Sequence, residues 1–190
     1  MAAIHRRAGA EAMVLLGAEA TRGRLEQLQA EGRLERFAII HLAAHGRDYP
    51  ADEPSAAALY LADGPADAMD ISQWTLGADL VALSACWSGR RPAHHSDESE
   101  ELFGDEIYGL QAAFFAAGAR QILGSLWPLS DRLAAAVMKA FHTGLAASGA
   151  PDLALQAVIN EQRRAGRPIY QWAPYMLIAL GRPGALAPAG

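Results

Sequence analysis

Two segments decide the fold expected for this chain: FAIIHLAAHG, residues 37–46, and DLVALSACWSG, residues 79–89. Both contain a short apolar run rich in Ile, Leu, Val and Ala, which is typical of strands covered on both faces in a parallel sheet. The first run stops at His45-Gly46, and the second stops at Cys86, the only cysteine in the chain. The two segments therefore predict neighbouring parallel strands in an α/β domain.

The residues that end these strands predict a catalytic pair. If the strands run side by side in the same direction, His45 and Cys86 meet at the carboxyl edge of the sheet, where open α/β sheets place their sites. A thiol is nucleophilic only as the thiolate, and an imidazole can favour that form and then protonate a leaving amine. The alternative is that Cys86 is a small buried hydrophobic residue and His45 a hydrogen-bonded loop histidine.

The other elements are predicted from periodicity and capping residues. Thr21 precedes a charged segment in which Leu25 and Leu28 share one face, so a surface helix capped near Thr21 is expected. Further elements are expected as a buried helix over 107–117, a third strand over 121–126, a helix from 131 to about 146 with Ser130 or Asp131 as its N-cap, a helix beginning at Pro151, and a final strand over 175–180.

Length and composition limit the class of protein. A chain of 190 residues fits one domain and can bury about 70% of the surface that it exposes when unfolded. It has 16 basic and 21 acidic residues and no basic stripe, so we do not expect nucleic acid as a partner. A lone cysteine and the lack of a long apolar run favour a cytoplasmic protein without a membrane span.

One segment carries residue types that bind metals. His94 and His95 lie among acidic residues in the polar segment 90–106. Adjacent histidines do not point the same way on a regular element, and nothing in the segment fixes a coordination geometry. We therefore expect an exposed loop and no metal site.

The order and spacing of several blocks are similar to those of a known family. The blocks are HLAAHG (41–46), AAALYLADG (56–64), ISQWTLGADLVALSACWSG (71–89), GLQAAFFAAGARQILGSLWPLSD (109–131), ALQAVIN (154–160) and YQWAPYMLIALG (170–181). Together they resemble the CHAT domain, a caspase-like group of cysteine peptidases related to separase and often fused to tetratricopeptide repeats. The resemblance covers roughly residues 16–182.

This resemblance implies a fold and its limits. It implies an α/β fold of the caspase-like three-layer α/β/α type with a mainly parallel central sheet, lacking the N-terminal part of the full domain. The corresponding organisation is a flexible lead over 1–12, the CHAT domain over 13–183 and a tail over 184–190.

Carried over to this chain, the resemblance assigns roles to individual residues. It makes His45 the general base or acid and Cys86 the nucleophile, with an oxyanion hole formed by the backbone N–H groups of Cys86 and Gly46. A glycine beside the histidine supports the last assignment, because it lets backbone approach a tetrahedral intermediate closely.

Three residues are expected around the substrate pocket. Trp87 stands where the family commonly has Glu, which alters the pocket beside the nucleophile. Ser84 stands where basic-specific relatives of the wider clan have an acidic residue that receives Lys or Arg, so basic specificity is not indicated. Trp127, just past the third strand, is expected at the same edge, either as a pocket wall or as a core tryptophan.

The resemblance implies a CHAT-type cysteine endopeptidase that needs no metal or organic cofactor. Its substrate would be a protein or peptide, and its activity would be regulated by a partner protein or by a fused tetratricopeptide-repeat region. The alternative is a catalytically silent caspase-like module that binds partners as a scaffold. A third hypothesis is a cysteine hydrolase of non-peptide acyl substrates, since the dyad chemistry is shared.

Overall fold

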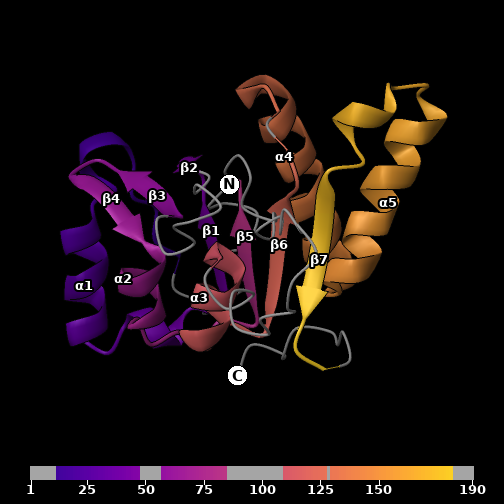
Figure 1. Cartoon of the computed structure of the whole chain (residues 1–190). Coiled ribbons are helices and arrows are strands. Elements are labelled where there is room, and N and C mark those ends of the chain that lie inside the picture. Colours follow the sequence, from indigo (N-terminus) through magenta and orange to yellow (C-terminus); the bar gives the residue numbers. More distant parts are fainter. Residues whose placement is uncertain (1–11, 48–56, 85–108, 128, 182–190) are drawn as a thin grey trace, which may run out of the picture.

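The computed structural model describes residues 12–47, 57–84, 109–127 and 129–181 and is built on a four-stranded sheet (Figure 1). The strand order is β1-β5-β6-β7. The strands are β1 (Ile39–Leu42), β5 (Leu80–Leu83), β6 (Gln121–Ser125) and β7 (Tyr175–Ala179). Strands β1, β5 and β6 are parallel, and β7 is antiparallel to β6. The predicted α/β fold with a mainly parallel sheet is confirmed.

Strand β5 contributes to both faces of the sheet. Leu80 and Ala82 join a core with α4 (Asp131–Ser148) and α5 (Pro151–Arg164). Val81 and Leu83 join a second core with α2 (Ala68–Ser72) and α3 (Leu110–Ala116). This period-two alternation, with all four residues of β5 buried, places helices on both sides of the sheet. The result is the three-layer arrangement that the family resemblance implies.

The first apolar run departs from its prediction in two ways. Both faces of β1 pack against a helical layer, Ile39 against the α4–α5 core and Ile40 and Leu42 against the α2–α3 core, but its four side chains are only partly buried. In the described sheet β1 is an edge strand and has a neighbour on one side alone. The strand also ends at Leu42, and His45 instead begins a separate strand, β2 (His45–Arg47).

Strand β2 belongs to a second, antiparallel sheet with β3 (Ala58–Leu61) and β4 (Gly64–Asp67), in the order β2-β3-β4. The β3–β4 hairpin is fastened to the start of α1 (Arg22–Ala30). In its turn, the Asp63 carboxylate accepts hydrogen bonds from the backbone N–H groups of Arg22 at 2.7 Å and Gly23 at 3.0 Å. These donors, first that of Gly23, lower the pKa of Asp63 because they stabilise its charged form.

The helices begin and end as their capping residues predict. The Thr21 hydroxyl accepts a hydrogen bond from Arg24 N at 3.0 Å, which confirms the expected cap of α1. Ser130 is the N-cap residue of α4, and Gly149 ends that helix with a φ of 68°. Three short 3-10 helices complete the described chain: η1 (Gly17–Glu19), η2 (Leu34–Arg36) and η5 (Ile169–Gln171).

Parts of three predictions lie outside the described residues. They are nearly all of the flexible lead, the whole tail over 184–190, and the start of the helix expected over 107–117. Within the described ranges, no helix combines the length and apolar character that a membrane span requires.

A pair of histidines joins β1 to α4. The Nε2 atom of His142 lies 2.9 Å from Nδ1 of His41, and the two rings stack with centroids 4.8 Å apart. His142 is only 1% exposed and shares an apolar stripe of α4 with Met138, Phe141 and Leu145. One of the two facing nitrogens must be protonated and the other bare, so this contact requires at least one neutral ring.

Candidate functional site

The carboxyl ends of β1 and β5 approach the site in matched register. Leu42 pairs with Leu83, and the backbone N–H of Ser84 donates to the Leu42 carbonyl at 2.9 Å. In the sequence, His45 is the third residue after Leu42 and Cys86 is the third residue after Leu83. The predicted parallel pairing of these two strands is confirmed, whereas the meeting of His45 and Cys86 at one edge stays a prediction. Cys86 and Trp87 lie outside the described residues.

His45 is the exposed first residue of β2, opposite Tyr60 of β3. The next residue, Gly46, pairs with Leu59. The imidazole therefore comes from the small antiparallel sheet, while the chain leading to Cys86 comes from the central sheet. The position of His45 at this edge thus depends on the path of the short connection between the end of β1 and the start of β2.

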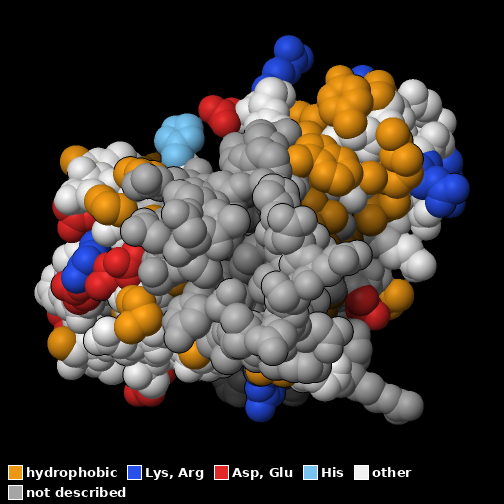
Figure 2. All heavy atoms as spheres, viewed as in Figure 1, with side chains coloured by type: hydrophobic (Ala, Val, Ile, Leu, Met, Phe, Trp, Pro, Cys, Tyr) orange, Lys and Arg blue, Asp and Glu red, His pale blue; other side chains and the backbone are white. Residues whose placement is uncertain are grey.

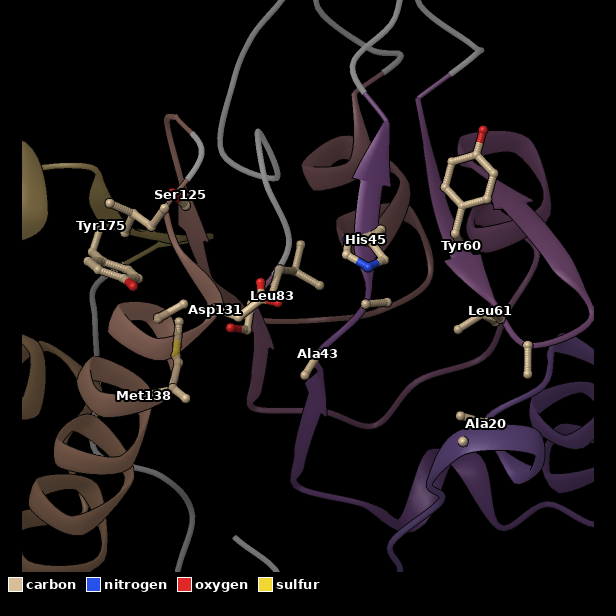
Figure 3. Close-up of a pocket in the computed structure, with 17 residues that line it drawn as sticks. Ala20, Ala43, His45, Tyr60, Leu61, Leu83, Ser125, Asp131, Met138 and Tyr175 are labelled. Atoms are coloured by element: carbon tan, nitrogen blue, oxygen red, sulfur yellow. The ribbon is translucent and has the colours of Figure 1, made fainter.

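An open pocket of about 700 Å³ surrounds this edge (Figure 3). It is lined by residues of η1, the small sheet, the strand ends and α4, namely Gly17, Ala20, Ala43, Ala44, His45, Tyr60, Leu61, Ala62, Leu83, Ser84, Ser125, Leu129, Asp131, Ala134, Ala135, Met138 and Tyr175. Figure 3 shows His45 between Tyr60 and Leu61 on one side and Leu83 and Tyr175 on the other. We call the second side, formed by β5, β6, β7 and α4, the central-sheet half of the pocket.

The walls of the pocket that the structure describes carry little charge. Among the described lining residues, Asp131 is the only acidic one, and there is no Lys or Arg. Asp131 is exposed and stands in the first turn of α4, where the helix dipole favours a carboxylate. The remaining walls are mostly Ala, Leu and Met. Such a pocket favours an uncharged group over an anionic one.

Hydroxyl groups supply most of the polarity in the central-sheet half. Ser125 donates its hydroxyl to the Trp127 carbonyl at 2.7 Å. Tyr175 is only 6% exposed, and its buried hydroxyl has no hydrogen-bond partner within the described part of the chain. Burial raises the pKa of Tyr175 to about 12, because it disfavours the phenolate. Tyr175 therefore presents a neutral hydroxyl at physiological pH.

The three residues predicted around the pocket have different outcomes. Ser84 lines the pocket. Trp87 is outside the described residues, and Trp127 is not among the lining residues. The indole N–H of Trp127 instead donates to the Tyr170 carbonyl at 3.0 Å, which fastens the end of β6 to η5. A substrate contact by Trp87 or Trp127 stays a prediction.

The segment fastened by Trp127 leads directly into Tyr175 at the start of β7. Ile169 and Tyr170 in η5 are more than half exposed. Figure 2 shows hydrophobic side chains gathered in this upper right part of the molecule. The indole N–H of Trp172 donates to the Arg167 carbonyl at 3.1 Å, and the Arg163 guanidinium lies 5.9 Å from the Trp172 ring centroid. These contacts brace the connection that delivers Tyr175 to the pocket.

Sequence reasoning missed Tyr175 as a pocket residue. It predicted a strand from residue 175 but had no signal for the strand's direction. Because β7 runs antiparallel to β6, its first residue lies at the edge where the parallel strands end. Tyr175 pairs with Ser125 at that edge.

The described residues offer no cluster suited to a metal. They contain no group of three or more His, Cys, Asp or Glu side chains that could hold an ion. His94 and His95, weighed above as metal ligands, lie outside the described part of the chain.

Comparison with known proteins adds the family. No curated protein matches this chain. The family model described as the CHAT domain matches residues 1–181 and so covers the central sheet, the small sheet, both helical layers and every residue that lines the pocket. The chain belongs to the CHAT domain family, a family of caspase-like peptidases.

Proposed function

We propose that this chain is a cysteine endopeptidase in which Cys86 is the nucleophile and His45 the general base and acid. One observation carries the proposal. The paired strands β1 and β5 end in register at Leu42 and Leu83, and the chain reaches His45 and Cys86 after the same number of residues. His45 also lines an open pocket large enough to receive a peptide side chain.

The proposed reaction has two halves. His45 accepts the thiol proton, and Sγ of Cys86 attacks the scissile carbonyl carbon to form a C–S bond. Backbone N–H groups of Cys86 and Gly46 stabilise the oxyanion. The C–N bond then breaks as His45 donates its proton to the leaving amine. In the second half, His45 takes a proton from water and the resulting hydroxide attacks the thioester carbon. The C–S bond then breaks, the carboxylic acid is released, and His45 returns its proton to the thiolate.

The described geometry supports these roles. His45 is exposed to the pocket and is therefore accessible to a substrate. Gly46 places no side chain between the imidazole and the backbone N–H assigned to the oxyanion hole. The Ser84–Leu42 hydrogen bond holds the two strand ends together just before the first segment passes from β1 to β2. We further propose, from the family resemblance, that a partner protein or an attached repeat region regulates the activity.

The proposal is tested by intact-mass analysis after incubation with peptidyl acyloxymethyl ketones, reagents that alkylate an active thiol. Since the chain has a single cysteine, an adduct of one peptidyl group that is absent from the Cys86→Ala protein assigns the thiol without ambiguity. A folded wild-type protein that none of the reagents labels contradicts an enzyme that is active on its own, and leaves a silent binding module or an enzyme that requires its regulatory partner. Labelling of the Cys86→Ala protein would show reaction elsewhere.

A further inference from the structure

The inference concerns the central-sheet half of the pocket and rests on the proposed peptidase function. In this half, Tyr175 is only 6% exposed. Its hydroxyl is buried and forms no hydrogen bond within the described part of the chain. A buried hydroxyl without a partner is costly in a folded protein. Its place in a pocket wall indicates that a ligand supplies the missing bond.

The chemistry around Tyr175 narrows the class of ligand. Leu83, Leu129 and Met138 provide apolar walls suited to a methylene chain. A carboxylate would find no Lys or Arg among the described lining residues. Among the same described residues a cation would find Asp131 alone as a carboxylate, and this group is exposed, screened by solvent and placed in the first turn of α4. The walls therefore favour a neutral side chain that ends in a hydrogen-bonding group.

A primary carboxamide meets these requirements. Its oxygen can accept from the Tyr175 hydroxyl, which stays protonated at physiological pH because burial raises its pKa to about 12. Its NH₂ group can donate to a hydroxyl oxygen such as that of Ser84, which lines the same pocket. A methionine side chain of similar length would fill the apolar walls but leave the Tyr175 hydroxyl unpaired.

The position of the subsite identifies which substrate residue it receives. Ser84 is two residues before Cys86 in the sequence, so this half of the pocket flanks the proposed nucleophile. The side chain nearest the attacked carbonyl belongs to the residue that precedes the scissile bond. We propose that Tyr175 is a specificity-determining residue that hydrogen-bonds the carboxamide of a glutamine at that position.

The test compares peptides that differ only at this residue. Acetyl-Ala-Ala-X acyloxymethyl ketones with X as Gln, Met, Glu or Lys label wild-type protein, Tyr175→Phe and the matched control Tyr170→Phe. Tyr170 is exposed and lies outside the pocket lining, so its variant removes the same atom elsewhere. We expect Gln to exceed Met about tenfold in labelling rate, and Tyr175→Phe to reduce that ratio about tenfold while Tyr170→Phe preserves it.

Other outcomes overturn the inference. An unchanged Gln-to-Met ratio in Tyr175→Phe shows that the hydroxyl does not read the substrate and is merely hydrated. Preferred labelling by Lys that Asp131→Asn abolishes assigns recognition to Asp131 instead. A large fall in the melting temperature of Tyr175→Phe, together with an equal fall in the labelling rates of all four reagents, shows a structural role.

A binding measurement separates this inference from the peptidase proposal. The Cys86→Ala protein is titrated calorimetrically with acetyl-Ala-Ala-Gln-amide and acetyl-Ala-Ala-Met-amide, with and without Tyr175→Phe. Tighter binding of the Gln peptide that depends on Tyr175 supports the subsite even if no reagent labels wild-type Cys86, in which case only the peptidase proposal fails. Equal binding of the two peptides overturns the subsite whatever the labelling shows.

Discussion

His41 and His45 lie four residues apart, yet the fold gives them opposite environments. His41 is inside β1, pairs in register with Ala82 of β5, and contacts the buried His142 through a 2.9 Å nitrogen–nitrogen distance. His45 begins β2, is exposed, and lines the pocket. The imidazole of His41 therefore joins the sheet to a helix, whereas the imidazole of His45 is accessible to a substrate.

The difference follows from where the first strand ends. Up to Leu42 the chain is hydrogen-bonded to β5 in the central sheet, and from His45 it is hydrogen-bonded to β3 in the small sheet. A histidine before this change of sheet faces a helix, and a histidine after it faces solvent. The comparison predicts that only His45 affects chemistry and only the His41–His142 pair affects stability.

The largest expected effect is the loss of activity in His45→Ala. Removing a general acid and base typically lowers the rate by about 10²- to 10⁴-fold, and we expect a similar fall in peptide hydrolysis. The midpoint of urea unfolding should stay close to that of wild type, because the His45 side chain is exposed. The rate is measured on a peptide whose acyloxymethyl ketone labels the wild-type protein. The midpoint is measured by urea unfolding followed by circular dichroism.

Retention of activity in a folded His45→Ala protein would contradict the assigned role. The matched control is Tyr60→Ala, which truncates the residue opposite His45 in the β2–β3 register and also lines the pocket. An equal loss in both variants would show that shape on this side of the pocket, rather than the imidazole, limits hydrolysis.

A smaller effect, of the opposite kind, is expected for His142→Ala. The change removes a fully buried side chain and the hydrogen-bond partner of His41 Nδ1. Cavity formation and the lost bond together should lower the free energy of unfolding by about 3 kcal/mol. Urea unfolding measures the loss, while labelling of Cys86 per folded molecule should remain near the wild-type value.

Two results would break this side of the comparison. An unfolding free energy equal to that of wild type would show that the histidine pair does not stabilise the α4–β1 contact. A specific loss of labelling at full stability would place His142 in the catalytic machinery. Thr143→Ala, on the exposed side of α4, is the control for helix truncation.

The smallest expected effect concerns the buried Tyr175 and the stability of the protein at alkaline pH. The pKa of Tyr175 is about 12 in the folded protein and about 10 in an unfolded chain. Between these values the unfolded chain binds fewer protons, so the free energy of unfolding falls as pH rises from about 10 to 12 and is unaffected by this group below about 10.

Tyr175→Phe should therefore weaken the alkaline loss of stability. Urea unfolding of wild type and variant at several alkaline pH values measures the difference, and Tyr170→Phe serves as the exposed control. Parallel stability curves for wild type and Tyr175→Phe across this pH range would contradict the buried environment of the hydroxyl.

Much of the fold could be predicted because apolar runs and capping residues are local signals. The segments that form β5, β6 and β7 are short and apolar. Thr21 marks the start of α1 through its side-chain hydroxyl, and Gly149 marks the end of α4 through its left-handed backbone conformation. The end of β1 at Leu42 could not be predicted. The segment LAAHG continues the apolar pattern, and only pairing with β3 moves the later residues into another sheet.

The site was predictable only in part. Matched strand ends followed from sequence, but the histidine pair and Tyr175 depend on contacts between distant segments. His142 did carry a signal, since it lies on the apolar stripe of α4 and a buried polar side chain needs a partner. Tyr175 carried none, because the direction of β7 decides which end of that strand meets the pocket.

The change of sheet after Leu42 also has a mechanical consequence. Backbone hydrogen bonds run from the β3–β4 hairpin to β2, and the hairpin turn is tied to α1 through Asp63. Hydrogen bonds therefore connect α1 to His45 through the hairpin, whereas the strand leading to Cys86 is held by the central sheet. Of the two proposed reacting groups, His45 begins a strand of one sheet and Cys86 follows a strand of the other in the sequence, so the distance between the groups depends on how these sheets are placed relative to each other.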